Sequence, residues 1–188
     1  VSKSAVFDLA GDYACQWILP WILVEVEDQS LQRQCQMAKQ ALTAAGLEYP
    51  LVGKPNMGCR GVGVRLLKDD AELADYLQGF PVGGCIQFQK LSQWDAEAGV
   101  FYVRDPDKAT GEVTSLTLKY TPFVVGDGER QLAELVAADA RAGELLHLYR
   151  SRHVARWHDV IPKGEPYRLV FAASHSRGAI FRDAGELI

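Results

Sequence analysis

The sequence predicts an α+β fold in which an antiparallel sheet carries helices packed on one face. Three observations predict it. A strand, a glycine-rich loop and a second strand follow one another at 51–54 and 62–67. An amphipathic helix over 69–78 comes directly afterwards. Alternating residues at 98–104 and 112–120 flank a short turn, as in a β-hairpin, and hairpin strands run antiparallel.

Composition indicates a folded, soluble chain. The 188 residues are 48% hydrophobic, which is enough for a core in one large domain or two small ones. A net charge of -4 leaves no basic stripe for a nucleic-acid partner. The most apolar run, 17–24, is too short to span a membrane, and no secretory leader precedes it. We therefore expect a cytoplasmic protein with neither nucleic-acid nor membrane partners, and the oligomeric state stays open between a monomer and a homo-oligomer.

The four cysteines lack the spacing of a zinc site. Cys15, Cys35, Cys59 and Cys85 are scattered, with no C-x-x-C pair. Reduced and mostly buried thiols are the expectation for such a chain. No metal ligand is predicted within these 188 residues.

The N-terminal part predicts a helix, a strand and a second helix. Residues 4–14 have near-helical apolar spacing, and an apolar run to Val26 follows, interrupted by Pro20. Asp28–Ser30 can cap a helix with an apolar stripe, and Gly46 ends it. Because Val1 is not an initiator methionine and a periodic stretch begins at once, we expect a piece of a longer chain.

The stretch 49–67 has the features of a phosphate-binding hairpin. Pro55 forces Lys54 into the extended region, so this lysine ends a strand. Gly58, Gly61 and Gly63 permit positive φ and a close approach of backbone N–H donors, and Arg60 adds charged donors. An ordinary glycine-rich hairpin with a surface lysine is the alternative. A P-loop is excluded because the lysine precedes the glycines, and a dinucleotide fingerprint because a strand follows them.

The middle of the chain continues as helix, strand and hairpin. Acidic residues open the helix over 69–78, as the helix dipole favours. A strand over 85–91 follows, and Glu97 begins the hairpin after the loop 92–96. The turn 105–111 reverses the chain into 112–120, which ends on Lys119 and Tyr120.

The last third predicts mostly helix. A valine-rich segment with Gly-Asp-Gly and then Leu-x-Glu-Leu occupies 124–135. Residues 130–156 follow as helix, and a loop at 162–166 leads to a strand over 167–171. His153 and His158 are not four residues apart, so we expect ordinary histidines here rather than metal ligands.

This ordered set of segments resembles the ATP-grasp superfamily, in particular its D-alanine-D-alanine ligase-like and cyanophycin-synthetase-like carboxylate–amine ligases. The strand-Lys-Pro, glycine loop, strand and helix are similar to the small central subdomain, and 124–135 is the second specific match. The resemblance covers nearly the whole chain. It implies a helix-strand-helix entry at 1–46, the small ATP-grasp subdomain at 47–120, and a helical insert with the start of the second ATP-grasp half at 121–188.

The resemblance also implies a set of nucleotide-binding residues. Lys3, Lys54 and Lys119 correspond to phosphate-binding lysines, Gln89, Lys90 and Leu91 to the adenine hinge, and Glu97 to the ribose ligand. Gly58, Arg60, Gly61 and Gly63 belong to the phosphate loop, and Arg177 serves acidic substrates or phosphates. Each residue has a plainer alternative: a tail lysine for Lys3, an amphipathic strand for the hinge, a solvated loop for Glu97 and a surface cation for Arg177. No catalytic residue is predicted.

The implied activity is a ligase reaction in which ATP and Mg²⁺ activate a carboxylate as an acyl phosphate for attack by an amine. The family's magnesium ligands are expected beyond Ile188, since no Glu-x-Asn strand occurs here. Small-molecule carboxylate and amine substrates are the expected partners. A kinase-type enzyme ranks low because no His-Arg-Asp or Asp-Phe-Gly motif is present. The alternative from another class is a nucleotide-binding or interaction module without chemistry.

Overall fold

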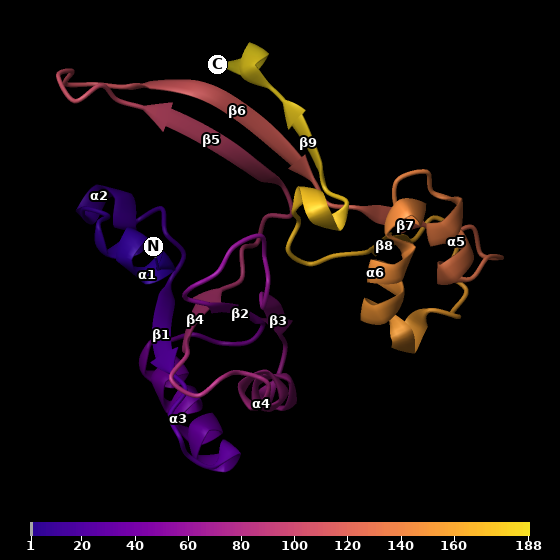
Figure 1. Cartoon of the computed structure of the whole chain (residues 1–188), viewed down its shortest axis with the longest axis horizontal. Coiled ribbons are helices and arrows are strands. Elements are labelled where there is room, and N and C mark those ends of the chain that lie inside the picture. The colour runs from indigo at the N-terminus through magenta and orange to yellow at the C-terminus, as the bar shows by residue number, and fades with distance from the viewer. Residues whose placement is uncertain (1) are drawn as a thin grey trace. The chain divides into compact units, whose positions relative to one another are not determined.

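The computed structural model describes residues 2–188, which fold into two compact units (Figure 1). The first unit runs to Gln93 and the second from Trp94 to Ile188. Each unit has its own cluster of buried hydrophobic residues. The expected division into segments 1–46, 47–120 and 121–188 concerns ATP-grasp subdomains and stays a prediction.

The first unit contains a four-stranded antiparallel sheet in the order β1-β4-β2-β3. Its strands are β1 (Trp21–Glu25), β2 (Leu51–Pro55), β3 (Arg65–Leu67) and β4 (Cys85–Lys90). The strand expected from residue 62 begins only at Arg65, because Gly61 and Gly63 both have positive φ and prolong the turn.

Two helices cover one face of this sheet, as predicted: α3 (Leu31–Ala44) and α4 (Asp70–Gln78). The caps are those that the sequence indicates. The Ser30 and Asp69 side chains accept the first N–H groups of their helices, and Gly46, at φ +63°, follows the end of α3. The buried cluster joins side chains of both helices and the sheet: Ala38, Leu42, Leu51, Leu67, Leu73, Tyr76, Leu77, Ile86 and Phe88.

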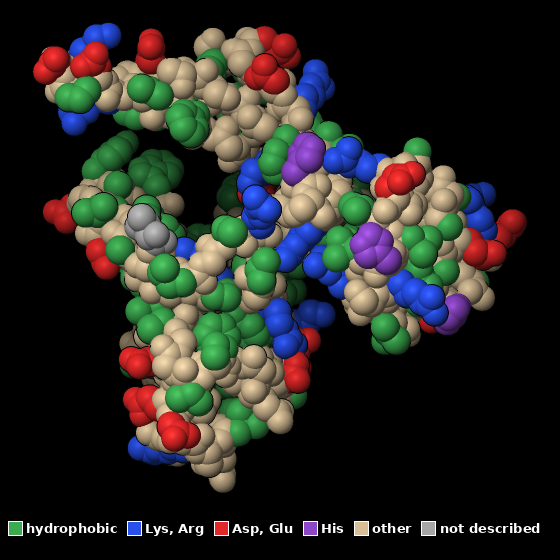
Figure 2. Space-filling view, in the orientation of Figure 1, with side chains coloured by type: hydrophobic (Ala, Val, Ile, Leu, Met, Phe, Trp, Pro, Cys, Tyr) green, Lys and Arg blue, Asp and Glu red, His purple; other side chains and the backbone are tan. Residues whose placement is uncertain are grey.

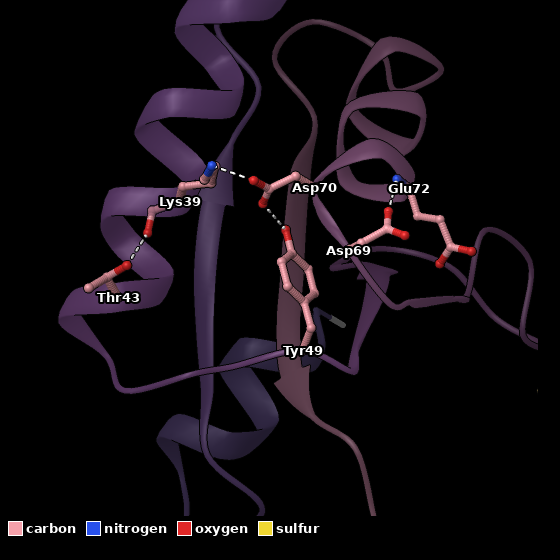
Figure 3. Close-up of polar contacts among 6 residues, drawn as sticks. All are labelled: Lys39, Thr43, Tyr49, Asp69, Asp70 and Glu72. Atoms are coloured by element: carbon pink, nitrogen blue, oxygen red, sulfur yellow. Dashed lines mark hydrogen bonds and ion pairs between the residues drawn. The ribbon is translucent and has the colours of Figure 1, made fainter.

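A polar clasp formed by Lys39, Tyr49 and Asp70 links α3 to the start of α4 (Figure 3). Lys39 Nζ lies 2.5 Å from one Asp70 carboxylate oxygen, and the Tyr49 hydroxyl donates to the other at 3.1 Å. The hydrogen bond from Lys39 holds the pKa of Asp70 below its ordinary value, and burial together with Asp70 raises the pKa of Tyr49. The clasp fixes where α4 begins relative to α3.

The helix predicted over 4–14 is broken into α1 (Lys3–Asp8) and α2 (Asp12–Cys15). Gly11 adopts an extended conformation between them and precedes α2 as its N-cap. Glycine has a low helix propensity, so the break occurs where the sequence favours helix least. Neither helix has a fully buried residue.

The second unit begins with a three-stranded antiparallel sheet in the order β5-β6-β9. Its strands are β5 (Glu97–Val103), β6 (Glu112–Tyr120) and β9 (Ile180–Asp183). The single antiparallel sheet that the sequence predicts is therefore wrong, because the central strands divide between two sheets. β4 is already hydrogen-bonded on both edges, to β1 and β2, so β5 has no free edge of β4 to join.

The rest of the second unit is a small helical body beside a two-stranded ribbon of β7 (Phe123–Val125) and β8 (Pro166–Arg168). The helices are α5 (Leu132–Ala138) and α6 (Leu146–Arg152), with 3₁₀ turns at Gly143–Leu145, Val154–Arg156, His175–Arg177 and Gly185–Leu187. The helix expected across 130–156 is interrupted because Asp139 turns extended after α5, and its carboxylate accepts the N–H groups of Arg141 and Ala142.

The cysteine expectation is wrong in one respect. All four thiols are free, but Cys15 and Cys59 are exposed and Cys35 and Cys85 only half-buried. Cys15 ends a thinly packed helix and Cys59 lies in the glycine loop, so neither has a core to enter. None of the helices in residues 2–188 is long and apolar enough to cross a bilayer.

Candidate functional site

The glycine loop of the first unit has the conformation that the sequence predicts. Gly58, Arg60, Gly61 and Gly63 all have positive φ, between 55° and 139°. A Cβ atom on Gly63 would lie 2.6 Å from the Pro55 ring, so no other residue fits there without a shift of the backbone. The Tyr76 hydroxyl donates to the Gly63 carbonyl at 2.7 Å and ties the loop to α4.

Five successive backbone N–H groups of this loop, from Met57 to Gly61, donate to no acceptor within residues 2–188. Met57 to Arg60 are exposed and Gly61 is half-buried. Backbone N–H groups that follow one another through positive-φ residues form a concave site for anions. The loop therefore offers donors suited to the oxygen atoms of a phosphate group.

Lys3 lies beside this loop. Its ammonium group donates to the carbonyl oxygens of Pro55 at 2.7 Å and Gly58 at 3.3 Å. The Asn56 side chain adds a second link, since its Oδ1 accepts the Ser4 N–H at 2.9 Å. The start of α1 is thus fastened to the loop, and Lys3 is held in place rather than extended into solvent.

Lys54 points to the sheet face opposite the helices. Its Nζ donates to Gln89 Oε1 at 2.6 Å and lies 5.6 Å from the centre of the Phe7 ring. Burial and the nearby Lys3 charge lower the pKa of Lys54. The first unit therefore brings together Lys3, Lys54, Gln89 and the glycine loop, while Lys90 ends β4 and Leu91 follows it.

The other two predicted ligands form an ion pair in the second unit. Glu97 and Lys119 are directly opposed in the β5–β6 ladder, and the lysine ammonium contacts Glu97 Oε1. Lys119 Nζ also lies 5.5 Å from the centre of the Phe181 ring. The expected common cleft of Lys54 and Glu97 concerns residues of different units and stays a prediction.

A cleft of about 500 Å³ adjoins this ion pair within the second unit. Its lining includes Glu97, Lys119, Thr121, Phe123 and Arg168. No sequence pattern indicates Arg168, which donates hydrogen bonds to the carbonyl oxygens of Val170 and Phe171 at 2.9 and 3.0 Å. Its contacts join β8 to the segment that follows it, and no local motif signals them.

Arg177 lies in the 3₁₀ turn His175–Arg177 of the second unit. Its carbonyl oxygen accepts a hydrogen bond from the buried Tyr149 hydroxyl at 2.8 Å. Burial and the charge of Arg177 lower the pKa of Arg152.

The Gly-Asp-Gly segment has a structural explanation. Asp127 accepts the backbone N–H groups of Glu129 and Arg130, and the Arg130 guanidinium at 2.6 Å, so the pKa of Asp127 lies well below its ordinary value. A Cβ atom on Gly126 would lie 2.2 Å from the Pro162 carbonyl oxygen. These residues shape the turn before α5.

Within residues 2–188, no group of three or more His, Cys, Asp or Glu side chains is placed to hold a metal ion. The prediction that the ligands lie beyond residue 188 remains a prediction.

The chain has similarity among solved structures but not among family models or curated sequences. No family model and no curated protein sequence matches the chain. Among solved structures, the chain is similar to a bifunctional glutathione synthetase from Pasteurella multocida, at 19% identity and a TM-score of 0.34. The match covers 91% of this chain but 24% of the synthetase, so the chain spans about a quarter of the length of that protein.

Proposed function

We propose that the chain is the nucleotide-binding region of an ATP-grasp ligase, which uses ATP to activate a carboxylate for attack by an amine. The observation that carries this proposal is in the first unit, where Lys3 and Lys54 accompany five unpartnered N–H groups of the loop from Met57 to Gly61. Together they supply positive charge and directed donors, the two features that bind phosphate groups.

Electrostatics favour an anion at this site. Burial and then the nearby Lys3 charge disfavour the protonated form of Lys54 and lower its pKa. A phosphate group between two ammonium groups turns their repulsion into attraction on both sides. Gln89 Oε1 at present accepts the Lys54 hydrogen bond and keeps the side chain extended along the sheet face.

The second unit contributes, on this proposal, the contacts that the resemblance assigns to Glu97 and Lys119. The Glu97 carboxylate has two acceptor oxygens, which suit the two hydroxyls of a ribose. Lys119 neutralises that carboxylate in the structure, and phosphate oxygens are an alternative partner for the same ammonium group. The adjoining cleft of about 500 Å³ lies in the usual size range of ligand pockets.

The proposed reaction needs no nucleophile from the protein. A substrate carboxylate oxygen attacks the γ-phosphorus of ATP, and ADP leaves with the bridging oxygen. The amine then attacks the acyl carbon of the acyl phosphate, inorganic phosphate leaves, and a proton is lost from the amine nitrogen. The side chains described here hold the phosphates and orient the nucleotide, which is the main protein contribution in phosphoryl transfer.

The proposal is tested by removing the Lys54 charge. In the natural full-length protein, Lys54→Ala and Lys54→Met should weaken ATP binding about ten- to a hundred-fold in the presence of magnesium, because a charge-assisted hydrogen bond is worth about 1.5–3 kcal/mol. Calorimetric titration measures this. Lys68→Met, at an exposed lysine of the same unit, is the matched control and should bind as the wild type does. Affinity within about two-fold of wild type in both Lys54 variants would refute the phosphate role.

Catalysis is tested separately from binding. The full-length protein should release ADP from ATP only when a carboxylate substrate is present, and an amine should then yield an amide. Tight ATP binding without ADP release across a panel of amino acids and small peptides would favour a nucleotide-binding module without chemistry.

A further inference from the structure

Gln87 is a polar side chain that the fold buries without a partner. The residue is 0% exposed, and within residues 2–188 neither its amide oxygen nor its amide nitrogen has a hydrogen bond. Buried side-chain amides nearly always have partners, because they give up hydrogen bonds to water on burial. An unpaired amide inside the first unit therefore points to a partner that the chain itself does not supply.

The side chain of Gln87 lies on the candidate nucleotide face of the sheet. Its neighbours Ile86 and Phe88 belong to the buried cluster beneath the helices, and side chains alternate along a strand. Gln87 therefore points the other way. It is directly opposite Lys54 in the β2–β4 ladder, so these two side chains lie next to each other on one face.

The residues beside Gln87 already belong to the proposed site. Gln89, two positions further along β4, accepts the Lys54 hydrogen bond and occupies the predicted adenine hinge. Gln87 is thus directly opposite the phosphate-binding lysine on the neighbouring strand, and it is two residues from Gln89 in the predicted hinge. Gln87 therefore lies on the same sheet face as Gln89, between that residue and the glycine-loop end of β2.

Helix α1 is a thin cover over this face. The Phe7 ring lies over Lys54, with its centre 5.6 Å from Nζ, and packs against Trp21 at 5.5 Å. None of the residues of α1 is fully buried, so little apolar surface holds the helix in place. A ligand would reach Gln87 by displacing the part of α1 around Phe7, since the start of the helix is fastened to the glycine loop.

We propose that Gln87 is a specificity-determining residue that reads the base of the bound nucleotide, a role that rests on the proposed function. A glutamine amide can donate from Nε2 to N7 of adenine while its Oε1 accepts from the 6-amino group. Guanine presents two acceptors, N7 and O6, along the same edge, so the amide oxygen would face an acceptor. The pairing selects adenine over guanine.

The test compares two ligands that differ in one atom. In 7-deaza-ATP a C–H group replaces N7, which removes the acceptor for Gln87 Nε2. Wild-type full-length protein should bind 7-deaza-ATP about three- to ten-fold more weakly than ATP, as the loss of one neutral hydrogen bond implies. In Gln87→Leu the two nucleotides should bind equally, and the preference for ATP over GTP should shrink by a similar factor.

A stability measurement separates this role from a structural one. Gln87→Leu removes an unpaired amide from a buried place, so its melting temperature should equal or exceed that of the wild type. Gln78→Leu, at an exposed glutamine ending α4, is the matched control and should keep the wild-type nucleotide preference. A structural glutamine would instead lower the melting temperature on substitution and leave the ratio of ATP to 7-deaza-ATP affinity unchanged.

Each outcome has one meaning. If the wild type binds ATP and 7-deaza-ATP equally, the assignment of Gln87 is overturned while the proposed function stands. The same holds if the difference persists in Gln87→Leu. If the wild type binds no ATP at all, both proposals fail. Should Gln87→Leu not fold, the wild-type comparison of ATP with 7-deaza-ATP and with purine riboside triphosphate, which lacks the 6-amino group, decides alone: equal binding of all three overturns the assignment.

Discussion

The lowered pKa of Lys54 gives the proposed site a signature in its pH dependence. Phosphate binding needs the protonated ammonium, and burial together with Lys3 brings its deprotonation below the ordinary pKa of 10.5. ATP affinity should therefore fall as the pH rises through the Lys54 pKa, starting below 10.5. Calorimetric titration between pH 7 and 10 measures this.

The matched variant for this experiment is Lys54→Arg. A guanidinium stays protonated over that whole range, so this variant should lose the alkaline decline even if its affinity at pH 7 is lower. A decline of equal size in both proteins would assign the effect to another group.

Gly63 should resist substitution more than other glycines of the first unit. It combines φ +71° with a Cβ position 2.6 Å from the Pro55 ring, and a left-handed conformation alone costs a non-glycine residue about 1–2 kcal/mol. Gly63→Ala should lower the free energy of unfolding by about 1–3 kcal/mol in chemical denaturation. Gly11→Ala, where φ is -71° and nothing lies within 4 Å of the new methyl group, should be nearly neutral.

At the level of single residues, the sequence predicted those features that depend on near neighbours. The caps Ser30 and Asp69 and the extended Lys54 before Pro55 follow from residues a few positions away, and the structure has them. Gln87 was missed because its importance comes from burial, and Arg168 because the cleft that it lines is built with residues distant in sequence, such as Glu97 and Lys119. No single-sequence pattern distinguishes a buried glutamine in a strand from one that faces water.

At the level of elements, the Lys39–Tyr49–Asp70 clasp should make the packing of α4 against α3 depend on pH. Because the Asp70 pKa is lowered in the folded chain, its contribution to stability is present above the ordinary pKa of 3.8 and is lost as the pH falls through the lower folded value. At pH 7 the melting temperature of Asp70→Asn should be below that of the wild type, and this difference in melting temperature should vanish as the pH falls below 3.8.

Glu48→Gln serves as the control for the clasp, since Glu48 is an exposed carboxylate close to Tyr49 in the sequence. It should show no such pH-dependent difference. A constant gap between Asp70→Asn and wild type at every pH would mean that the carboxylate charge is not the cause.

The elements were predicted better than their pairing. Strands and capped helices are local, so 51–55, 85–90, 97–103 and 112–120 were found within a few residues. The single-sheet expectation failed because β1, far away in sequence, pairs with β4 and occupies the edge on which the next strand would have continued. Likewise β9, near the far end of the chain, pairs with β6, although no turn connects the two strands.

In the whole molecule, each unit has its own buried cluster. A substitution in one cluster is therefore expected to destabilise mainly the unit that contains it. Leu73, on α4, is fully buried in the first cluster. Leu73→Ala should cost about 2–5 kcal/mol of unfolding free energy. Hydrogen exchange should report that loss in α3, α4 and β4. Leu9→Ala, at a leucine that is 85% exposed, should leave exchange in these elements unchanged.

The candidate site could be predicted where its residues belong to correctly predicted segments of the chain. Lys3, Lys54, Gln89 and the glycine loop are grouped in the first unit, and Glu97 pairs with Lys119 in the second. The Lys54–Gln89 and Glu97–Lys119 contacts arise from strand ladders whose members were correctly placed along the chain, whereas side-chain hydrogen bonds bring Lys3 to the glycine loop. Contacts to the carboxylate and amine of the proposed reaction could not be predicted, because no motif in the chain encodes the shape and charge that would recognise them.

The three-stranded sheet of the second unit has a practical consequence for handling the protein. In the described residues, β5 pairs on one side only, with β6, and it exposes Val100, Phe101 and Tyr102 by 57–67%. Figure 2 shows hydrophobic side chains at the surface around this hairpin. A bulge at Phe101 and Tyr102 makes the edge less regular, which is one means by which natural proteins discourage strand addition. Concentrated solutions should therefore aggregate slowly through pairing of exposed β5 edges, and Val100→Lys should slow that aggregation.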